Sequence, residues 1–297
     1  MPNMEIEEDI VLIAGPTASG KTSKAIEIAK SSGGVIINTD SMQVYQELRV
    51  ITARPTAEEE AMAPHFLFGH VSGKEPYSVA QWLADVSNLL DESEISNGKI
   101  IFVGGTGLYF NSLLTGISPV PTVDPDIRTK WREASQSQSS ELLHSHLQSV
   151  DPTMAEQLNA NDTQRIIRAL EVIESTGISL LDWQKKKGKP VLEKNRSVHK
   201  LLIMPDRLIL HERINQRFDQ MVEEGGLKEV EELLELDLPE GSSLMKAIGV
   251  PQLAAHLRGE LTIEEAIEQA KAATRQYAKR QCTWFNNSFD ESWNLIS

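Results

Sequence analysis

The sequence has 297 residues, 40% of them hydrophobic and 24% charged, which predicts one large globular domain with an insertion or two domains. The net charge of −14 argues against a protein that coats nucleic acid non-specifically. A single cysteine, Cys282, excludes a disulfide framework or a cysteine-rich metal site, and there is neither a secretion signal nor an apolar run of membrane-spanning length. We therefore expect a cytoplasmic protein that has no membrane-spanning segment.

The first third of the chain alternates between apolar runs of strand length and segments with the apolar spacing of helices. The predicted order is a strand at 10–14, a helix at 22–30, a strand at 35–38, a helix at 77–90 and a strand at 99–103. Strands that alternate with helices in this way are typical of an α/β fold, in which helices flank a parallel sheet.

The pattern changes at residue 119, where prolines and aspartates interrupt the chain. Helical spacing with no convincing strand runs from 126 to about 183; strand character returns at 199–204, and long helices follow. We therefore predict a core formed by 1–118 and 201–297 and an all-helical insertion at 119–200. That insertion holds 12 Lys/Arg and 11 Asp/Glu, against 17 and 32 in the rest of the chain. Its relative basicity is compatible with a solvated surface or with a local basic site.

Residues 15–22 match the pattern of a phosphate-binding loop, Gly, four residues, Gly, Lys, Ser/Thr, between a predicted strand and a predicted helix. The glycines let the backbone curl so that N–H groups point at phosphate oxygens, the lysine adds a positive charge, and the final hydroxyl is a ligand for Mg²⁺. The motif predicts a P-loop fold without specifying which phosphate is bound. The residues of the loop are Gly15, Pro16, Thr17, Ala18, Ser19, Gly20, Lys21 and Thr22.

Asp40 follows the second predicted strand, and a glycine-rich segment, 104–107, follows the third. Since the carboxyl ends of parallel strands border the ligand crevice, we expect Asp40 to lie beside the phosphate loop. It is a candidate general base, although a turn or helix-cap role is the alternative. Thr106 is a candidate hydrogen-bond partner of the reacting group, in a segment that is equally compatible with a plain turn.

Taken together, these motifs resemble the tRNA dimethylallyltransferase (tRNA isopentenyltransferase) family, of the bacterial type. The resemblance extends over nearly the whole chain and is carried by six segments in the family's order: 15–22, 40–45, 52–56, 103–110, 161–172 and 279–285. It implies transfer of a dimethylallyl group from its diphosphate to the exocyclic amine of the adenine 3′ of the anticodon. It also implies Mg²⁺ as cofactor and a helical insertion that grips the anticodon stem-loop, and we expect a monomer.

Within this resemblance, Asp40 is expected to take the proton of the amine, with Thr106 and Lys21 as further catalytic groups. Lys21 and the loop amides would stabilise the diphosphate as it leaves, with Mg²⁺ held at Thr22. An arginine near the start of the C-terminal segment is expected at the diphosphate, and Arg217 is the candidate; a structural salt bridge is its alternative role.

The resemblance also predicts contacts with tRNA, from the segment around Asp40, from the insertion and from the last long helix. For Arg165 and Arg168, three residues apart on one predicted helix, the alternative is surface ion pairing with Asp162 or Glu171. The expected tRNA-binding residues are Asp40, Ser41, Met42, Gln43, Thr106, Arg128, Gln164, Arg165, Ile166, Ile167, Arg168, Lys279, Arg280 and Gln281.

Three positions depart from the family pattern. Ile51 stands where the family usually has glycine, Arg54 replaces a lysine, and Val250-Pro251 replaces a Gly-Tyr pair. Three other functions compete with this hypothesis. A small-molecule kinase would bind ATP at the phosphate loop, an adenylate isopentenyltransferase would prenylate free AMP, and an RNA-binding protein would have no catalytic role for the loop and Asp40.

Overall fold

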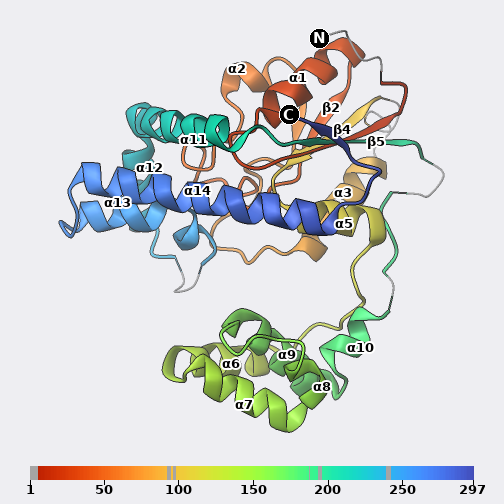
Figure 1. The fold of residues 1–297 in the computed structure, drawn as a ribbon, viewed down its shortest axis with the longest axis vertical. Helices are drawn as coiled ribbons and strands as arrows, with labels where there is room; N and C mark the ends of the chain where they lie inside the picture. The colour runs from red at the N-terminus through yellow and green to blue at the C-terminus, as the bar shows by residue number, and fades with distance from the viewer. Residues whose placement is uncertain (1–5, 92–94, 96–97, 187, 193–195, 239–241) are drawn as a thin grey trace. The chain divides into compact units, whose positions relative to one another are not determined.

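The computed structural model describes every residue except 1–5, 92–94, 96–97, 187, 193–195 and 239–241. The chain forms two compact units, one made of Met1–Leu114 with Val191–Ser297 and the other of Thr115–Pro190 (Figure 1). The helical unit is thus bounded by 115 and 190, compared with the predicted 119 and 200. The final ten residues of the predicted insertion lie in the other unit, because they lead into a strand of its sheet.

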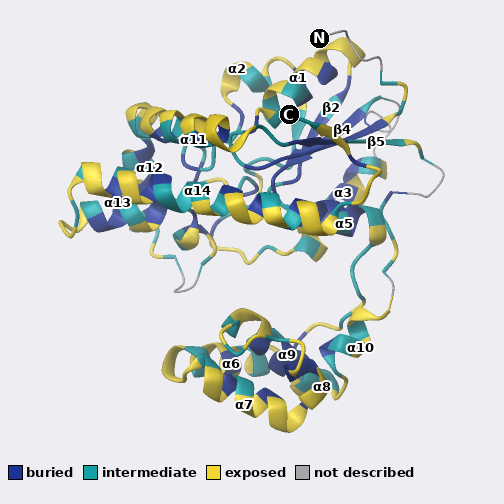
Figure 2. Cartoon of the chain, viewed as in Figure 1, coloured by how far each residue is buried: buried dark blue, intermediate teal, exposed yellow. Residues whose placement is uncertain are grey.

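The larger unit is built on a parallel sheet of six strands in the order β3-β2-β4-β1-β5-β6. The strands are β1 (Ile10–Ala14), β2 (Val35–Asn38), β3 (His65–Phe66), β4 (Ile100–Gly104), β5 (Val198–Ile203) and β6 (Asn294–Ile296). β1 and β4 are buried along their whole length, as expected for central strands covered by helices on both faces (Figure 2). The α/β fold predicted from the sequence is confirmed.

The helices of this unit supply the layers around the sheet. They are α1 (Lys21–Ser32), α2 (Ala57–Glu60), α3 (Val79–Asp91), α5 (Gly107–Thr115, which ends at the unit boundary), α11 (Arg207–Met221), α12 (Leu227–Glu235), α13 (Val250–Leu257) and α14 (Ile263–Ser288). A π-helical turn, Val222–Gly226, joins α11 to α12, and a 3₁₀ turn, Leu244–Lys246, precedes α13. α14 packs against both α11 and α13. A separate apolar cluster forms where α12 and α13 cover the segment 44–51.

The smaller unit contains the helices α6 (Pro125–Ser137), α7 (Ser140–Val150), α8 (Pro152–Ala155), α9 (Thr163–Thr176) and α10 (Leu180–Gln184). Ser or Asp side chains cap their N-termini, as at Asp162 of α9, and so satisfy amides that have no partner within the helix. Its core includes Trp131, Leu143 and Leu170, which are at most 5% exposed. In the described part of the chain, no helix is both long enough and apolar enough to cross a membrane.

Candidate functional site

Three neighbouring strands of the sheet, β2, β4 and β1, deliver three loops to one edge. The phosphate loop follows β1, Asp40 comes two residues after β2, and Gly105-Thr106 follows β4. Because all three strands are parallel, the loops lie side by side at the carboxyl edge of the sheet. The peptide N–H groups of Thr39 and Thr106 strengthen this arrangement, since they donate to the carbonyls of Val103 and Thr39.

The phosphate loop has the backbone that its sequence predicts. Gly20 has φ 91°, a conformation that an L side chain rarely adopts, and a Cβ on Gly15 would lie 2.6 Å from the carbonyl oxygen of Ile203. α1 begins at Lys21, so the amides of its first turn face the loop and favour an anion there. Removal of the ammonium group from water lowers the pKa of Lys21 to about 8, although the charge of Asp40 opposes this fall.

α11 adds two arginines to the loop. Arg217 donates from Nη2 to the Thr17 hydroxyl, and Arg213 donates from Nη1 to the Ser19 carbonyl at 3.5 Å. Burial lowers the pKa of Arg217 to about 10, and the charge of Asp40 again opposes the fall, so both Lys21 and Arg217 remain cations at neutral pH. Within the described residues Arg217 forms no ion pair, so the alternative role as a structural salt bridge is not observed there.

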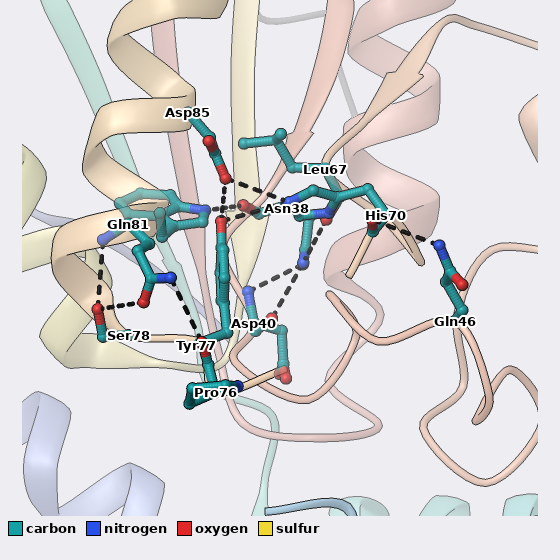
Figure 3. Close-up of polar contacts among 11 residues, drawn as sticks. Asn38, Asp40, Gln46, Leu67, His70, Pro76, Tyr77, Ser78, Gln81 and Asp85 are labelled. Atoms are coloured by element: carbon teal, nitrogen blue, oxygen red, sulfur yellow. Dashed lines mark hydrogen bonds and ion pairs between the residues drawn. The ribbon is translucent and has the colours of Figure 1, made fainter. Parts of the chain in front are cut away.

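Asp40 is held in place by a buried asparagine (Figure 3). Asn38 Oδ1 accepts the Asp40 N–H at 2.9 Å, while Asn38 Nδ2 donates to the carbonyls of Asp40 and Leu67, both at 3.0 Å. Asp40 Oδ1 accepts the Met42 N–H at 2.9 Å. The other carboxylate oxygen, Oδ2, accepts no hydrogen bond among the described residues, which leaves it available to a substrate.

Ser41 and Gln43, two residues expected at tRNA, are tied to neighbouring loops. The Thr106 hydroxyl accepts the Ser41 N–H at 3.0 Å, so Thr106 links the loops after β2 and β4. The Gln43 amide donates to the carbonyls of Thr52 and Ala53 at 2.8 and 2.9 Å. The NH₂ group of Gln43 is therefore used within the protein, and only its carbonyl oxygen is left for a ligand.

Gln281, a residue expected at the tRNA, is largely buried and makes hydrogen bonds to two loops of the site. Its side chain is 6% exposed, Oε1 accepts the Thr17 N–H at 2.9 Å, and Nε2 donates to the Gly105 carbonyl at 2.9 Å. A Cβ on Gly105 would lie 2.4 Å from Nε2, so only glycine allows this close approach. The amide thus joins the phosphate loop to the loop after β4, and Gln281 also belongs to the lining of a small hollow that contains Thr106 and Trp284.

These groups surround one pocket of about 380 Å³, within the usual range for a small ligand. At one end lie the polar residues Thr17, Lys21, Thr22 and Arg217, with Asp40 at the side. The rest of the lining combines polar side chains, among them Lys246 and Arg280, with a group of apolar residues that sequence reasoning missed. The apolar residues are Met42, Ile51, Ala53, Ile214, Phe218, Met221, Ala247 and Ile248. The one signal in the sequence was the spacing of Ile214, Phe218 and Met221 on one face of the helix that carries Arg217.

The negative charge of Asp40 affects the pKa of two nearby tyrosines. Burial, assisted by the negative charge of Asp40, raises the pKa of Tyr277 and of Tyr109 well above the usual range. Tyr277 lines the main pocket and also a hollow of about 230 Å³ beside it, as does Arg280. Thr106 and Trp284 belong to this hollow, and the Trp284 ring lies against Gly107. The two cavities thus share part of their lining.

A divalent cation can be accommodated only if the ligand brings part of the coordination sphere. The described residues contain no cluster of three or more His, Cys, Asp or Glu side chains suited to a metal. Thr22 and Asp40 nevertheless line the same pocket, and both carry oxygen donors. Mg²⁺ commonly takes one or two protein oxygens and completes its shell with phosphate oxygens and water, so these residues fit an ion that arrives with a diphosphate.

In the helical unit, the expected tRNA-binding residues are only partly accessible. Ile166 is fully buried in the core of the unit, so its side chain is unable to contact RNA. Arg165 pairs with Asp162 at 3.5 Å and Arg168 with Glu171 at 3.3 Å, which are the ion pairs considered as their alternative role. Their side chains remain 75% and 41% exposed. Gln164 is exposed, whereas Arg128 and Ile167 are half-buried.

Comparisons with known proteins agree with one another. Residues 43–288 match the model of a family described as IPP transferase, and residues 8–64 match one described as Isopentenyl transferase. The tRNA dimethylallyltransferase of Rhizobium etli (strain CIAT 652) is 48% identical over 297 residues, covering 100% of both chains, and that of Bartonella henselae is 50% identical over 97% of this chain and 98% of its own.

Solved structures give the same result. The tRNA isopentenylpyrophosphate transferase of Bacillus halodurans is 34% identical with a TM-score of 0.68, over 98% of this chain and 90% of that one. A eukaryotic dimethylallyltransferase, crystallised in the course of acting on tRNA, is 26% identical with a TM-score of 0.80, over 97% of this chain and 73% of that one.

Proposed function

Since the chain belongs to the IPP transferase family, we propose that it transfers the dimethylallyl group of dimethylallyl diphosphate to the exocyclic amine of the adenine 3′ of the anticodon in tRNA. The observation that carries this proposal is one pocket that combines the cations Lys21 and Arg217 at the phosphate loop with a group of apolar residues and with Asp40. A diphosphate with a short hydrocarbon tail would set its charged part against these cations and its tail against the apolar residues. In this proposal the carboxylate of Asp40 faces the nucleophile that attacks the first carbon of the tail.

In the proposed reaction, the bond between the first prenyl carbon and the diphosphate oxygen breaks, and its electron pair leaves with the diphosphate. The adenine nitrogen forms the new bond to that carbon and gives one proton to Asp40. Negative charge grows on the diphosphate as it leaves, and Lys21, Arg217 and the amides at the start of α1 stabilise it. Mg²⁺, held at Thr22 with Asp40 nearby, would supply further positive charge to the phosphate oxygens.

The acceptor base would approach through the hollow beside Thr106. An adenine in a tRNA loop must leave its stack to enter such a site, at a cost of a few kcal/mol. Tyr277 and Trp284 offer aromatic surface for stacking there, and Arg280 lines both the hollow and the donor pocket. Lys279, exposed on the same helix, is placed to contact phosphates. These four residues come from α14, which explains why the last long helix of the sequence belongs to the site.

We further propose that the helical unit binds the anticodon stem-loop. Residues 115–190 hold nine Lys/Arg and ten Asp/Glu, so the unit is close to neutral in a chain of net charge −14. Replacing Arg165 and Arg168 by glutamine should weaken tRNA binding and lower its salt dependence by about 0.7–0.9 logarithmic units for each phosphate that is no longer neutralised. Lys228→Gln, which removes an exposed, ion-paired cation from α12, is the matched control and should leave the slope unchanged. An unchanged slope in the double variant would assign the RNA surface to other residues.

One labelling experiment distinguishes the proposed function from its alternatives. The protein is incubated with labelled dimethylallyl diphosphate and Mg²⁺ and with unmodified tRNA, AMP or no acceptor, and ATP consumption is followed in parallel. We expect label in tRNA alone. Label in AMP would favour the adenylate isopentenyltransferase, which the match of residues 8–64 to the isopentenyl transferase model keeps relevant. ATP consumption without prenyl transfer would favour a kinase.

We also expect the enzyme to act as a monomer in the cytoplasm. Every residue that lines the donor pocket comes from one chain and from one compact unit, so no second copy is needed to complete it. Its single cysteine excludes a disulfide bond within the chain. Sedimentation at the concentration of the activity assay tests the monomer directly, and a dimer with full activity would contradict it.

A further inference from the structure

We propose that Ile51 is the end wall of the prenyl pocket and restricts the donor to a five-carbon chain. This inference rests on the proposed function, because it concerns which allylic diphosphate that pocket accepts. Ile51 is 6% exposed, lines the pocket that contains Lys21 and Arg217, and belongs to the apolar cluster under α12 and α13. It therefore separates the pocket from the interior of the unit.

The direction of the pocket follows from α11. Arg213 and Arg217 contact the phosphate loop, so this level of the helix marks the diphosphate end. Phe218 and Met221 continue the lining toward the C-terminus of α11. At about 1.5 Å per residue, Met221 lies roughly 6 Å further along the helix than Arg217. That length is comparable to an extended dimethylallyl group and too short for a ten-carbon chain.

Ile51 closes the pocket just beyond that level. A Cβ on Gly226, in the turn after Met221, would lie 2.9 Å from Ile51 Cδ1. A Cβ on Gly249, before α13, would lie 3.3 Å from Ile51 Cγ2 and 3.3 Å from Phe218 Cε2. The isoleucine is thus wedged between two backbones that lack side chains, with the ring of Phe218 against the same glycine. A chain that extended past Ile51 would therefore meet the backbone at these glycines and the ring of Phe218.

Ile51 is also unable to retreat easily. The carboxylate of Glu229, on α12, accepts the backbone N–H groups of Arg49, Val50 and Ile51, the last at 2.8 Å. Three hydrogen bonds to one ionised group hold the loop against the helix. A longer prenyl chain would have to break these bonds or distort the packing of Phe218. A steric clash with Ile51 therefore excludes the longer donor.

The test compares dimethylallyl diphosphate with geranyl diphosphate as donors to tRNA in the wild type and in Ile51→Ala. With either donor one carbon–oxygen bond breaks, one carbon–nitrogen bond forms and diphosphate is released, so only the tail differs. Each carbon that a pocket is made to accept or reject changes kcat/KM by about 10- to 200-fold. We therefore expect Ile51→Ala to raise kcat/KM for geranyl diphosphate by at least about tenfold relative to that for dimethylallyl diphosphate.

Leu253→Ala is the matched control. It removes the same number of carbons from a fully buried residue of the same apolar cluster that does not line the pocket, so it should lower stability without changing donor preference. If Ile51→Ala does not fold, Ile51→Val supplies a smaller change in the same direction, measured also as inhibition of dimethylallyl transfer by geranyl diphosphate. An unchanged donor ratio and unchanged inhibition in folded variants that transfer the dimethylallyl group would overturn the inference. Absence of dimethylallyl transfer by the wild type would instead overturn the proposed function.

Discussion

Replacing Asp40 by asparagine should remove the base of the proposed reaction while keeping the shape of the site. The remaining side-chain oxygen can still accept the Met42 N–H, as Oδ1 does at 2.9 Å, and the bonds of Asn38 to the Asp40 backbone do not involve the carboxylate. The amide NH₂ then replaces the free oxygen and is unable to take a proton. General-base catalysis contributes about 10²–10⁴-fold, which corresponds to roughly 3–5 kcal/mol of transition-state free energy.

The electrostatic effect of the same substitution can be separated from the loss of the base. The charge of Asp40 raises the pKa of Lys21, which burial lowers to about 8, so Asp40→Asn lowers it further. A lower pH restores the charge of Lys21, whereas it does not restore a missing base. A decrease of 10² or more that is not reversed when the assay is repeated at a lower pH therefore measures the base and not the protonation of Lys21.

The appropriate assay is a single turnover with enzyme in excess over tRNA at about pH 7, because slow product release would hide the chemical step. Binding of dimethylallyl diphosphate should change little, since Lys21, Arg217 and the loop amides hold the diphosphate. Asp85→Asn is the control: Asp85 accepts the Tyr77 hydroxyl hydrogen bond at 2.5 Å outside the pocket (Figure 3). A near-normal rate for Asp40→Asn would refute the assignment. Partial rescue by added Mg²⁺ would instead assign Asp40 to the metal.

Three further predictions concern neighbouring groups. As pH rises above about 8, Lys21 loses its charge in the free enzyme, so kcat/KM for the donor should fall while kcat at saturating donor stays level, and pH profiles of both parameters check this. Glu229→Ala should lower the free energy of unfolding in urea by about 2–4 kcal/mol, because three backbone N–H groups lose their acceptor, whereas Glu232→Ala, exposed on the same helix, should change it by less than about 0.5 kcal/mol. Gln281→Leu should reduce the single-turnover rate by about tenfold or more, because its amide holds the two loops together, and should lower tRNA affinity in filter binding much less. A decrease in affinity as large as the decrease in rate would show that Gln281, which also lines the hollow beside Thr106, acts mainly through the RNA.

The parts of the fold that were predictable are those in which local sequence and tertiary burial agree. β1, β2 and β4 are almost entirely apolar, β5 is apolar in its second half, and each of the four strands lies within one or two residues of its predicted position. β3 and β6 contain two and three residues, too few to show a periodicity. They exist because neighbouring strands offer free backbone groups, and that is information the local sequence does not contain.

The candidate site also has parts that were predictable from the sequence and parts that were not. The phosphate loop was predictable because its chemistry requires a contiguous motif, and Asp40 because the end of a parallel strand is a fixed place in such a sheet. The apolar residues of the pocket were not predictable, since Ile51 lies more than 150 residues before α11 and the segment that precedes α13. Only the tertiary fold brings these three parts together. The hydrogen bonds of Gln281 to two loops were not predictable for a related reason: a polar residue beside Arg280 on a helix gives no sign of which of the two faces solvent.

The balance of charge in the pocket gives Asp40 a second role in the proposed reaction. In the free enzyme its carboxylate favours the charged forms of both Lys21 and Arg217, which burial disfavours. When Asp40 takes the proton of the amine, that negative charge disappears at the moment when the departing diphosphate gains one. The two cations therefore exchange one anionic partner for another within a water-poor site, where such interactions are strong. Release of diphosphate then becomes easier once Asp40 loses its proton to solvent, because the carboxylate competes again for the same cations. In the proposed reaction, proton transfer and departure of the leaving group are thus coupled through Lys21 and Arg217, and Asp40 is the one acidic side chain among the described residues that line the pocket.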